Sequence, residues 1–155
     1  MAKLTSRWRR DRGAELLELT LALPILLLAF AAMVDFAFMF QRLVVMQNAA
    51  REGARLASLP GYFVPGGTND VIRVRVQSYV QSGTGYTPPL ADITVVVDSS
   101  LDPDGGGPLP PLSAVRVDVT APYSFTFIGP IVRMFQGATW NGITLRANST
   151  MRLEG

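Results

Sequence analysis

One apolar run near the N-terminus constrains this chain more than any other feature. Residues 19–40 contain a single ionisable side chain, Asp35. A helix that crosses a bilayer needs about 20 mostly apolar residues at a rise of about 1.5 Å each. The run therefore predicts one transmembrane segment over about residues 17–40. No Pro-Gly pair occurs before Pro60-Gly61, so we expect the segment to belong to a long helix over residues 14–59.

Charge on one flank of the run predicts its direction. Residues 1–13 form a leader with one acid, Asp11, and five basic residues: Lys3, Arg7, Arg9, Arg10 and Arg12. Basic residues stay on the cytoplasmic side of a membrane helix. We expect a cytoplasmic leader, an extracytoplasmic domain over residues 60–155, and membrane lipid as a partner.

The composition argues against catalysis. The chain has no cysteine and no histidine, so it lacks thiolate chemistry, the commonest general base and the commonest metal ligand. The predictions are no enzyme activity, no cofactor, no metal and no small-molecule substrate. The pI of about 9.4 reflects the leader, not a basic patch of groove size, so nucleic acid is not an expected partner.

The part after Pro60 predicts a small α+β domain. Asn69 is a candidate N-cap for a helix over residues 70–82, although the β-branched run in 71–76 also allows a strand. The remaining pattern predicts a flexible loop and an antiparallel sheet of three or four strands. These assignments are strands over 93–97, 114–120 and 143–153, a loop over 102–111, an interruption at Pro122 with a possible continuation over 123–127, and a short helical turn over 129–137.

Two acids and a glycine lie where the leader meets the apolar run. The order Gly13, Ala14, Glu15, Glu18 resembles a class III signal sequence, which a prepilin peptidase cuts after the glycine. Cutting after Gly13 would make Ala14 the first mature residue and Glu18 the fifth. The alternative is that both acids occupy a first helical turn, where the helix dipole favours negative charge.

The second half of the long helix carries small residues at helical spacing. Ala50, Gly53, Ala54 and Ala57 leave a shallow groove that lets another backbone approach closely, and we predict a packing seam there instead of a solvated face. Its polar borders are Arg51, Glu52 and Arg55. The partner would be the protein's own sheet or another subunit. Asp35 is expected either to reach the headgroups or to pair with another subunit.

These motifs together resemble the TadE-like pseudopilins of the tight-adherence (Tad, Flp) pilus system. The resemblance covers roughly residues 10–57, and Leu19 stands where pilins of this system usually have Tyr. The matching features are Arg10 to Ala14, Leu23-Pro24, Asp35-Phe36 and the Ala-rich segment over residues 47–57.

The resemblance implies a pilin-like fold and a non-catalytic role as a minor pilin or assembly component. It also implies the bacterial inner membrane as the location, with the cell-surface pilus as a later one. The implied partners are a prepilin peptidase and other pilins and pseudopilins. The alternatives are a membrane-anchored extracytoplasmic binding protein outside any fibre, and a secreted domain with an ordinary signal peptide.

Overall fold

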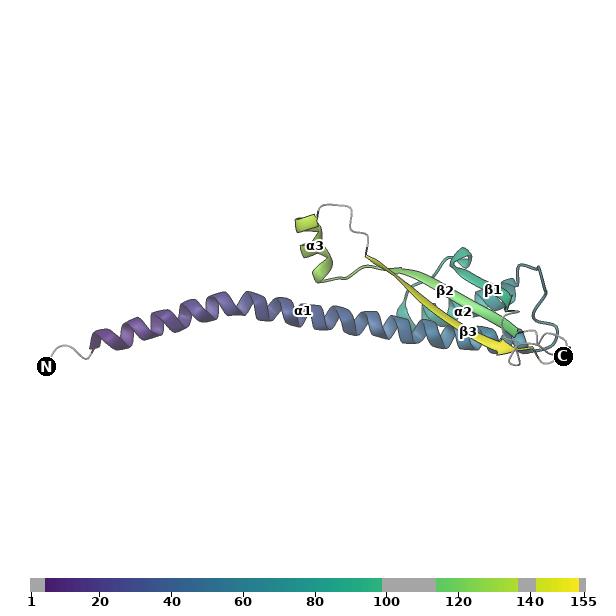
Figure 1. Ribbon diagram of the computed structural model, residues 1–155, viewed down its shortest axis with the longest axis horizontal. Helices are drawn as coiled ribbons and strands as arrows, with labels where there is room; N and C mark the ends of the chain where they lie inside the picture. Colours follow the sequence, from purple (N-terminus) through teal and green to yellow (C-terminus); the bar gives the residue numbers. More distant parts are fainter. Residues whose placement is uncertain (1–4, 99–113, 137–141, 154–155) are drawn as a thin grey trace, which may run out of the picture. The chain divides into compact units, whose positions relative to one another are not determined.

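The computed structural model describes residues 5–98, 114–136 and 142–153, and Figure 1 shows the order of its elements. The expected loop over 102–111 lies wholly outside these ranges, and so does residue 137, the end of the predicted turn over 129–137. The elements are α1 (Thr5–Ser58), α2 (Asp70–Thr84), a short 3-10 helix η1 (Leu90–Asp92), β1 (Ile93–Asp98), β2 (Ala114–Tyr123), α3 (Ile128–Gln136) and β3 (Ile143–Arg152). This is the predicted α+β class, with a long N-terminal helix and a three-stranded antiparallel sheet.

Helix α1 begins at Thr5, earlier than the predicted start at Ala14. The added turns contain no proline and four arginines, which are good helix formers. Pro24 lies inside the helix, and α1 continues through it to Ser58. Gly61 then adopts a left-handed φ of 85°, which glycine tolerates and which turns the chain away from the helix axis.

The sheet has the order β1-β2-β3, so β2 is central. Strand β2 runs unbroken through Pro122, which pairs with Thr144; the predicted interruption there is wrong. The register explains how β2 tolerates this proline, because β1 begins at Ile93, opposite Val119, and does not reach Pro122. Beyond Thr120 only β3 flanks β2, so Pro122 sits on a local edge where a missing N–H is tolerated. The predicted continuation over 123–127 is also wrong, since the strand ends at Tyr123.

One face of the sheet carries the core. Alternate residues of β2 are buried, including Val115, Val117 and Val119, as expected for a half-buried strand. The opposite face is polar, and Arg116 and Asp118 form an ion pair on it at 3.0 Å. The buried apolar side chains of the helices are Met46, Ala49, Ala50, Ala54 and Ala57 from α1 and Ile72, Val76 and Val80 from α2.

Helices α1 and α2 run antiparallel against each other. A Cβ on Gly53 would contact the side chain of Val76, and a Cβ on Gly83 would lie 2.6 Å from Val45 Cγ1. The later position in one helix therefore meets the earlier position in the other. Both contacts use a glycine, which lets the helix backbones approach closely.

Residues 71–76 form part of helix α2, not a strand. Asn69 precedes α2 in a left-handed conformation, with φ 50° and ψ 39°, a conformation that asparagine adopts more readily than most residues. Asn69 occupies the predicted N-cap position, and its backbone carbonyl accepts from Ile72 and Arg73, but its side chain makes no cap hydrogen bond. The side chain bonds to Val64 and Gly67 instead, because the left-handed backbone turns it towards the preceding loop.

The chain divides into two compact units. One consists of Met1–Ala37 with Phe125–Trp140, and the other of Phe38–Ser124 with Asn141–Gly155. The first unit contains most of the apolar run and α3. The second contains the rest of α1, α2 and the sheet, so the C-terminal part of α1 folds together with the sheet.

Candidate functional site

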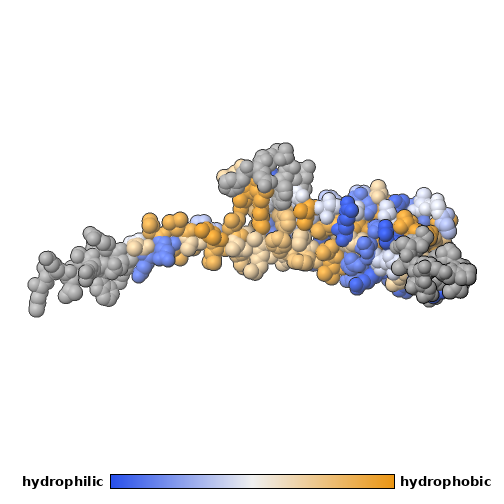
Figure 2. All heavy atoms as spheres, viewed as in Figure 1, coloured by the Kyte–Doolittle hydropathy of each residue, from blue (hydrophilic) through white to orange (hydrophobic). Residues whose placement is uncertain are grey.

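The first half of α1 exposes a continuous apolar surface. Within the described residues, α1 is the one helix long and apolar enough to cross a membrane. Figure 2 shows this stretch of α1 as a mostly orange surface. Apolar exposure of this extent marks a membrane or protein contact. The exposed large side chains between Leu16 and Phe40 include Leu19, Leu21, Ile25, Leu26, Phe30, Met33 and Phe38.

The predicted processing residues lie on α1 at the start of this surface. Gly13, Ala14 and Glu18 are all exposed. A Cβ added to Gly13 would meet nothing within 4 Å among the described atoms, so no packing requires glycine there. Cleavage after Gly13 stays a prediction.

Asp35 is fully buried although it lies in the apolar run. Its carboxylate accepts backbone N–H bonds from Thr126 at 2.9 Å, Phe127 at 2.9 Å and Ile128 at 2.7 Å. Ile128 is the first residue of α3, and Thr126 and Phe127 directly precede it. The N–H groups at the start of a helix have no partner within the helix. The negative charge also faces the positive end of the helix dipole.

This arrangement lowers the cost of a charge in the apolar run. An aspartate at the centre of a membrane helix costs about 3 kcal/mol on insertion scales, and hydrogen bonds to a charged group are worth about 1.5–3 kcal/mol each. The nearby rings of Phe36 and Phe125 meet edge to face at 5.7 Å. Asp35 thus has partners within its own chain, in the unit that holds α3, and its pairing with another subunit stays a prediction.

The small-residue stripe of α1 lies against its own chain. Ala50, Ala54 and Ala57 are fully buried. Gly53 is buried too, and a Cβ there would contact the side chain of Val76 and lie 3.3 Å from Val117 Cγ1. The stripe therefore meets both α2 and the central strand.

The polar borders of the stripe are less buried. Arg51 is exposed, whereas Glu52 joins two helices: its carboxylate bonds to Arg55 at 3.1 Å and to Arg75 of α2 at 3.3 Å. The hydrogen bond from Arg55 lowers the pKa of Glu52, and burial opposes that shift. Exposed ion pairs of this kind contribute little to stability, so the apolar seam carries most of the packing energy.

Arg42 is a site that the sequence did not indicate. Its guanidinium lies 4.8 Å from the ring centre of Tyr86 and 5.2 Å from that of Tyr123, and it donates to the carbonyl of Pro122 at 3.4 Å. A cation over two aromatic faces is held by their quadrupoles. Arg42 is the first charged residue after Asp35, so it marks the end of the apolar run. In the sequence, only this position at the end of the run distinguishes Arg42 from other arginines.

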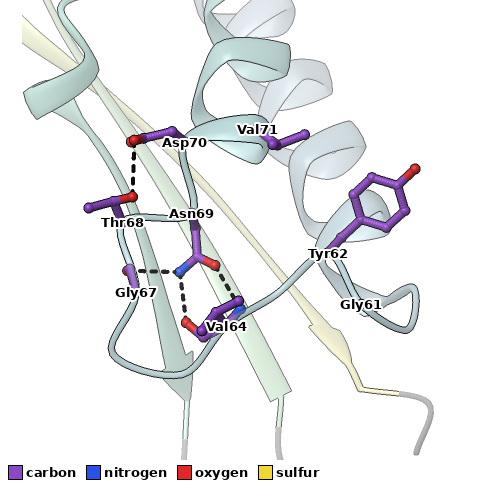
Figure 3. Close-up of a pocket in the computed structure, with 8 residues that line it drawn as sticks. All are labelled: Gly61, Tyr62, Val64, Gly67, Thr68, Asn69, Asp70 and Val71. Carbon is purple, nitrogen blue, oxygen red and sulfur yellow. Dashed lines mark hydrogen bonds between the residues drawn. The ribbon is translucent and has the colours of Figure 1, made fainter.

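A shallow hollow beside α2 is explained by its own loop. Figure 3 shows the Asn69 side chain pointing into the turn, where it accepts from Val64 N–H at 2.8 Å and donates to the carbonyls of Val64 and Gly67. Thr68 donates to Asp70 at 3.0 Å. These polar groups bond to one another, and the hollow is open to solvent. Its lining residues are Gly61, Tyr62, Val64, Gly67, Thr68, Asn69, Asp70 and Val71.

The part of the chain that the structure describes brings no three carboxylate, imidazole or thiol groups together to hold a metal ion. The geometry consists instead of an apolar helix surface, a buried seam and an internally bonded aspartate. The family model described as TadE-like protein matches residues 13–55. This stretch of α1 is TadE-like.

The TadE-like segment contains the apolar run, Asp35 and most of the small-residue stripe, which confirms the resemblance inferred from the motifs. It ends at Arg55, before Ala57 and before α2 and the sheet. No curated protein and no solved structure shows a significant match to the chain.

Proposed function

We propose that this chain is a non-catalytic pseudopilin of a Tad (Flp) pilus machine, acting as a minor pilin or an assembly component. The observation that supports the proposal is that α1 has two different parts. Its TadE-like segment joins an exposed apolar surface to a buried seam in one continuous helix. A helix of this kind anchors the chain in lipid through one part and carries a folded domain on the other.

The apolar surface of α1 has two uses in this proposal. Before assembly it contacts lipid in the bacterial inner membrane, with the basic leader in the cytoplasm and the α+β domain outside. In the fibre the same surface packs on the helices of other pilins and pseudopilins, which places the protein at the cell surface. A prepilin peptidase would cut after Gly13.

Glu18 has a defined role in this proposal. It lies exposed at the border of the apolar run, where a carboxylate is unfavourable unless it is neutralised. A neighbouring subunit's new N-terminal amino group would neutralise it during assembly. Glu18 would therefore oppose simple anchoring and favour assembly.

The test compares Glu18→Leu with Glu15→Leu in the native host. Both remove an exposed acid near the start of the run. Glu18→Leu should leave the protein in the membrane fraction at normal or higher abundance, while the number of pili counted by microscopy falls. Glu15→Leu should leave piliation normal. Normal piliation with Glu18→Leu would favour the alternative of an anchored binding protein outside the fibre.

Mass spectrometry of the N-terminus tests processing separately. The wild-type protein should begin at Ala14, and Gly13→Phe should retain the leader. No described atom lies within 4 Å of a Cβ on Gly13, so phenylalanine there should not disturb the fold, and a retained leader would report on the peptidase. An intact leader in the wild-type protein would contradict cleavage.

A further inference from the structure

The segment between β2 and β3 returns to the apolar run of α1. Three consecutive backbone N–H groups, those of Thr126, Phe127 and Ile128, bond to Asp35. We propose that α3 is a second membrane contact, which lies in the extracytoplasmic interface of the bilayer with its apolar side in lipid. The proposal rests on the membrane-spanning role of α1.

The depth of the attachment supports this position. Asp35 lies seven residues before Arg42, the next charged residue of the chain. At a rise of about 1.5 Å per residue, Asp35 is about 10 Å from Arg42 along the helix. Interfacial helices bury their apolar side about 5–10 Å into the boundary between headgroups and acyl chains. With Arg42 at the membrane surface, a helix bonded at Asp35 begins about 10 Å below that surface, which is the depth of an interfacial helix.

Helix α3 and the residue before it, Phe127, expose apolar side chains that can enter lipid. Phe127 is 48% exposed, Ile131 38% and Met134 81%. Arg133 is exposed as well, and helical geometry places it about 160° around the axis from Ile131. Figure 2 shows orange atoms on α3. The helix thus presents apolar side chains on one side and a cation on the other, the pattern of a helix that lies in a membrane interface.

The hydrogen bonds at Asp35 also fit a low-dielectric setting. Free N–H groups at the start of a helix can bond to water when the helix is outside the membrane, but hydrocarbon offers no partner. The carboxylate supplies an acceptor for the N–H of Ile128, the first residue of α3, and for those of the two residues before it. Asp35 in turn obtains the donors that a buried charge requires.

Lipid is the occupant that agrees with the neighbouring surface. The exposed apolar side chains of α1 on either side of Asp35 include Met33 at 70% and Phe38 at 50%. The apolar side of α3 belongs to the same compact unit as Met33. If α1 contacts lipid at this level, α3 meets the same phase.

Single cysteines can test the proposal cleanly, because the chain has no cysteine of its own. We would introduce Met134→Cys on α3, Met33→Cys on α1 and Val74→Cys on α2 in the full chain, and label each with a polarity-sensitive fluorophore. Val74 is 49% exposed and lies in the unit that holds the sheet. The labelled proteins are reconstituted at high lipid excess into vesicles of phosphatidylethanolamine and phosphatidylglycerol, with brominated acyl chains as quenchers.

Quenching by the brominated chains should be at least about fivefold stronger at position 134 than at position 74, and within about twofold of position 33. Iodide in the water should quench position 74 only. Equal iodide quenching at 134 and 74 would overturn the proposal, and so would a label at 134 that neither quencher reaches, because protein would then cover it. Absent lipid quenching at 33 would overturn the anchor itself and the proposal with it.

Asp35→Leu in the Met134→Cys background tests the attachment. Iodide quenching at 134 should rise severalfold. In a second protein that combines Asp35→Leu with Met33→Cys, the label at 33 should stay in lipid. Unchanged quenching at 134 would show that Asp35 does not position α3, and would overturn that part of the inference.

Discussion

The Asp35 carboxylate accepts a 2.7 Å hydrogen bond from the backbone N–H of Ile128, 93 residues later in the chain. This bond and its two neighbours attach the start of α3 to the apolar run. Two energies therefore oppose each other at residue 35. The charge disfavours insertion of α1, and the hydrogen bonds favour the native arrangement of α3.

Asp35→Leu should separate these two energies. Insertion should become easier by about 2–3 kcal/mol on insertion scales, so membrane abundance stays normal or rises. The three N–H groups lose an acceptor, at about 1–3 kcal/mol for each group left unpaired. Trypsin should then cut after Arg133 at least about tenfold faster in detergent micelles. A loss of about 1.4 kcal/mol in the free energy of local opening corresponds to a tenfold change in the opened population. Cutting after Arg116 in β2 serves as the control and should not change.

Asp35→Asn keeps one carbonyl oxygen as an acceptor, so its rate of cutting after Arg133 should be intermediate. Cutting of Asp35→Leu after Arg133 at the wild-type rate would contradict the role of Asp35 in holding the start of α3.

Gly53→Leu should destabilise the protein even though leucine is a better helix former by about 0.8 kcal/mol. Its side chain would overlap Val76 and crowd Val117, and overpacking costs about 1–3 kcal/mol or more. The matched control is Arg51→Leu, which places the same side chain on the exposed face of the same turn and should be nearly neutral. Thermal unfolding of the full chain in micelles, followed by circular dichroism, measures both. Equal stability of the two variants would show that the stripe tolerates bulk.

Substitutions at Asn69 should rank in a defined order of stability. Asn69→Gly keeps the left-handed backbone but loses three side-chain hydrogen bonds, at about 1–2 kcal/mol in total net effect. Asn69→Ala loses the same bonds and adds about 1 kcal/mol of left-handed strain. The free energy of unfolding in urea should therefore fall in the order Asn, Gly, Ala. If Ala were at least as stable as Gly, backbone strain at this position would not contribute.

Arg42 should couple energetically to Tyr86. Arg42→Ala and Tyr86→Leu each remove one side of the contact, and a double-mutant cycle should give a coupling of about 0.5–1 kcal/mol. Tyr86→Phe keeps the aromatic face and should stay within about 0.5 kcal/mol of wild type. Arg42→Lys keeps the charge but loses the planar guanidinium that lies over both rings, so its coupling energy to Tyr86 should be smaller than that of Arg42. A coupling energy of zero would show that the contact between Arg42 and Tyr86 does not stabilise the fold.

A reporter fused after Gly155 should be active only outside the cytoplasm. The reason is the basic leader, which holds the N-terminal flank of a single membrane helix in the cytoplasm. Paired alkaline phosphatase and fluorescent-protein fusions measure the two sides. A fluorescent cytoplasmic fusion with no phosphatase activity would reverse the proposed orientation.

Local periodicity in the sequence determined much of this fold. The run over 19–40 predicts the long apolar helix, the alternation of Val115, Val117 and Val119 predicts the buried face of β2, and the spacing of Ala50, Gly53 and Ala57 predicts a helix stripe. The strand and stripe patterns repeat every two or about 3.6 residues, and the run over 19–40 is continuous, so a short window of sequence is enough to reveal each of them.

Tertiary structure alone decided which distant residues meet. Asp35 bonds to residues 126–128, and Arg42 lies over the rings of Tyr86 and Tyr123. The Asn69 side chain turns back to Val64 and makes no cap hydrogen bond to α2. Pro122 stays in β2 because the register leaves it beyond the end of β1. None of these contacts has a period along the chain, since each depends on where packing of the elements brings a charge or a backbone group that would otherwise remain unpaired.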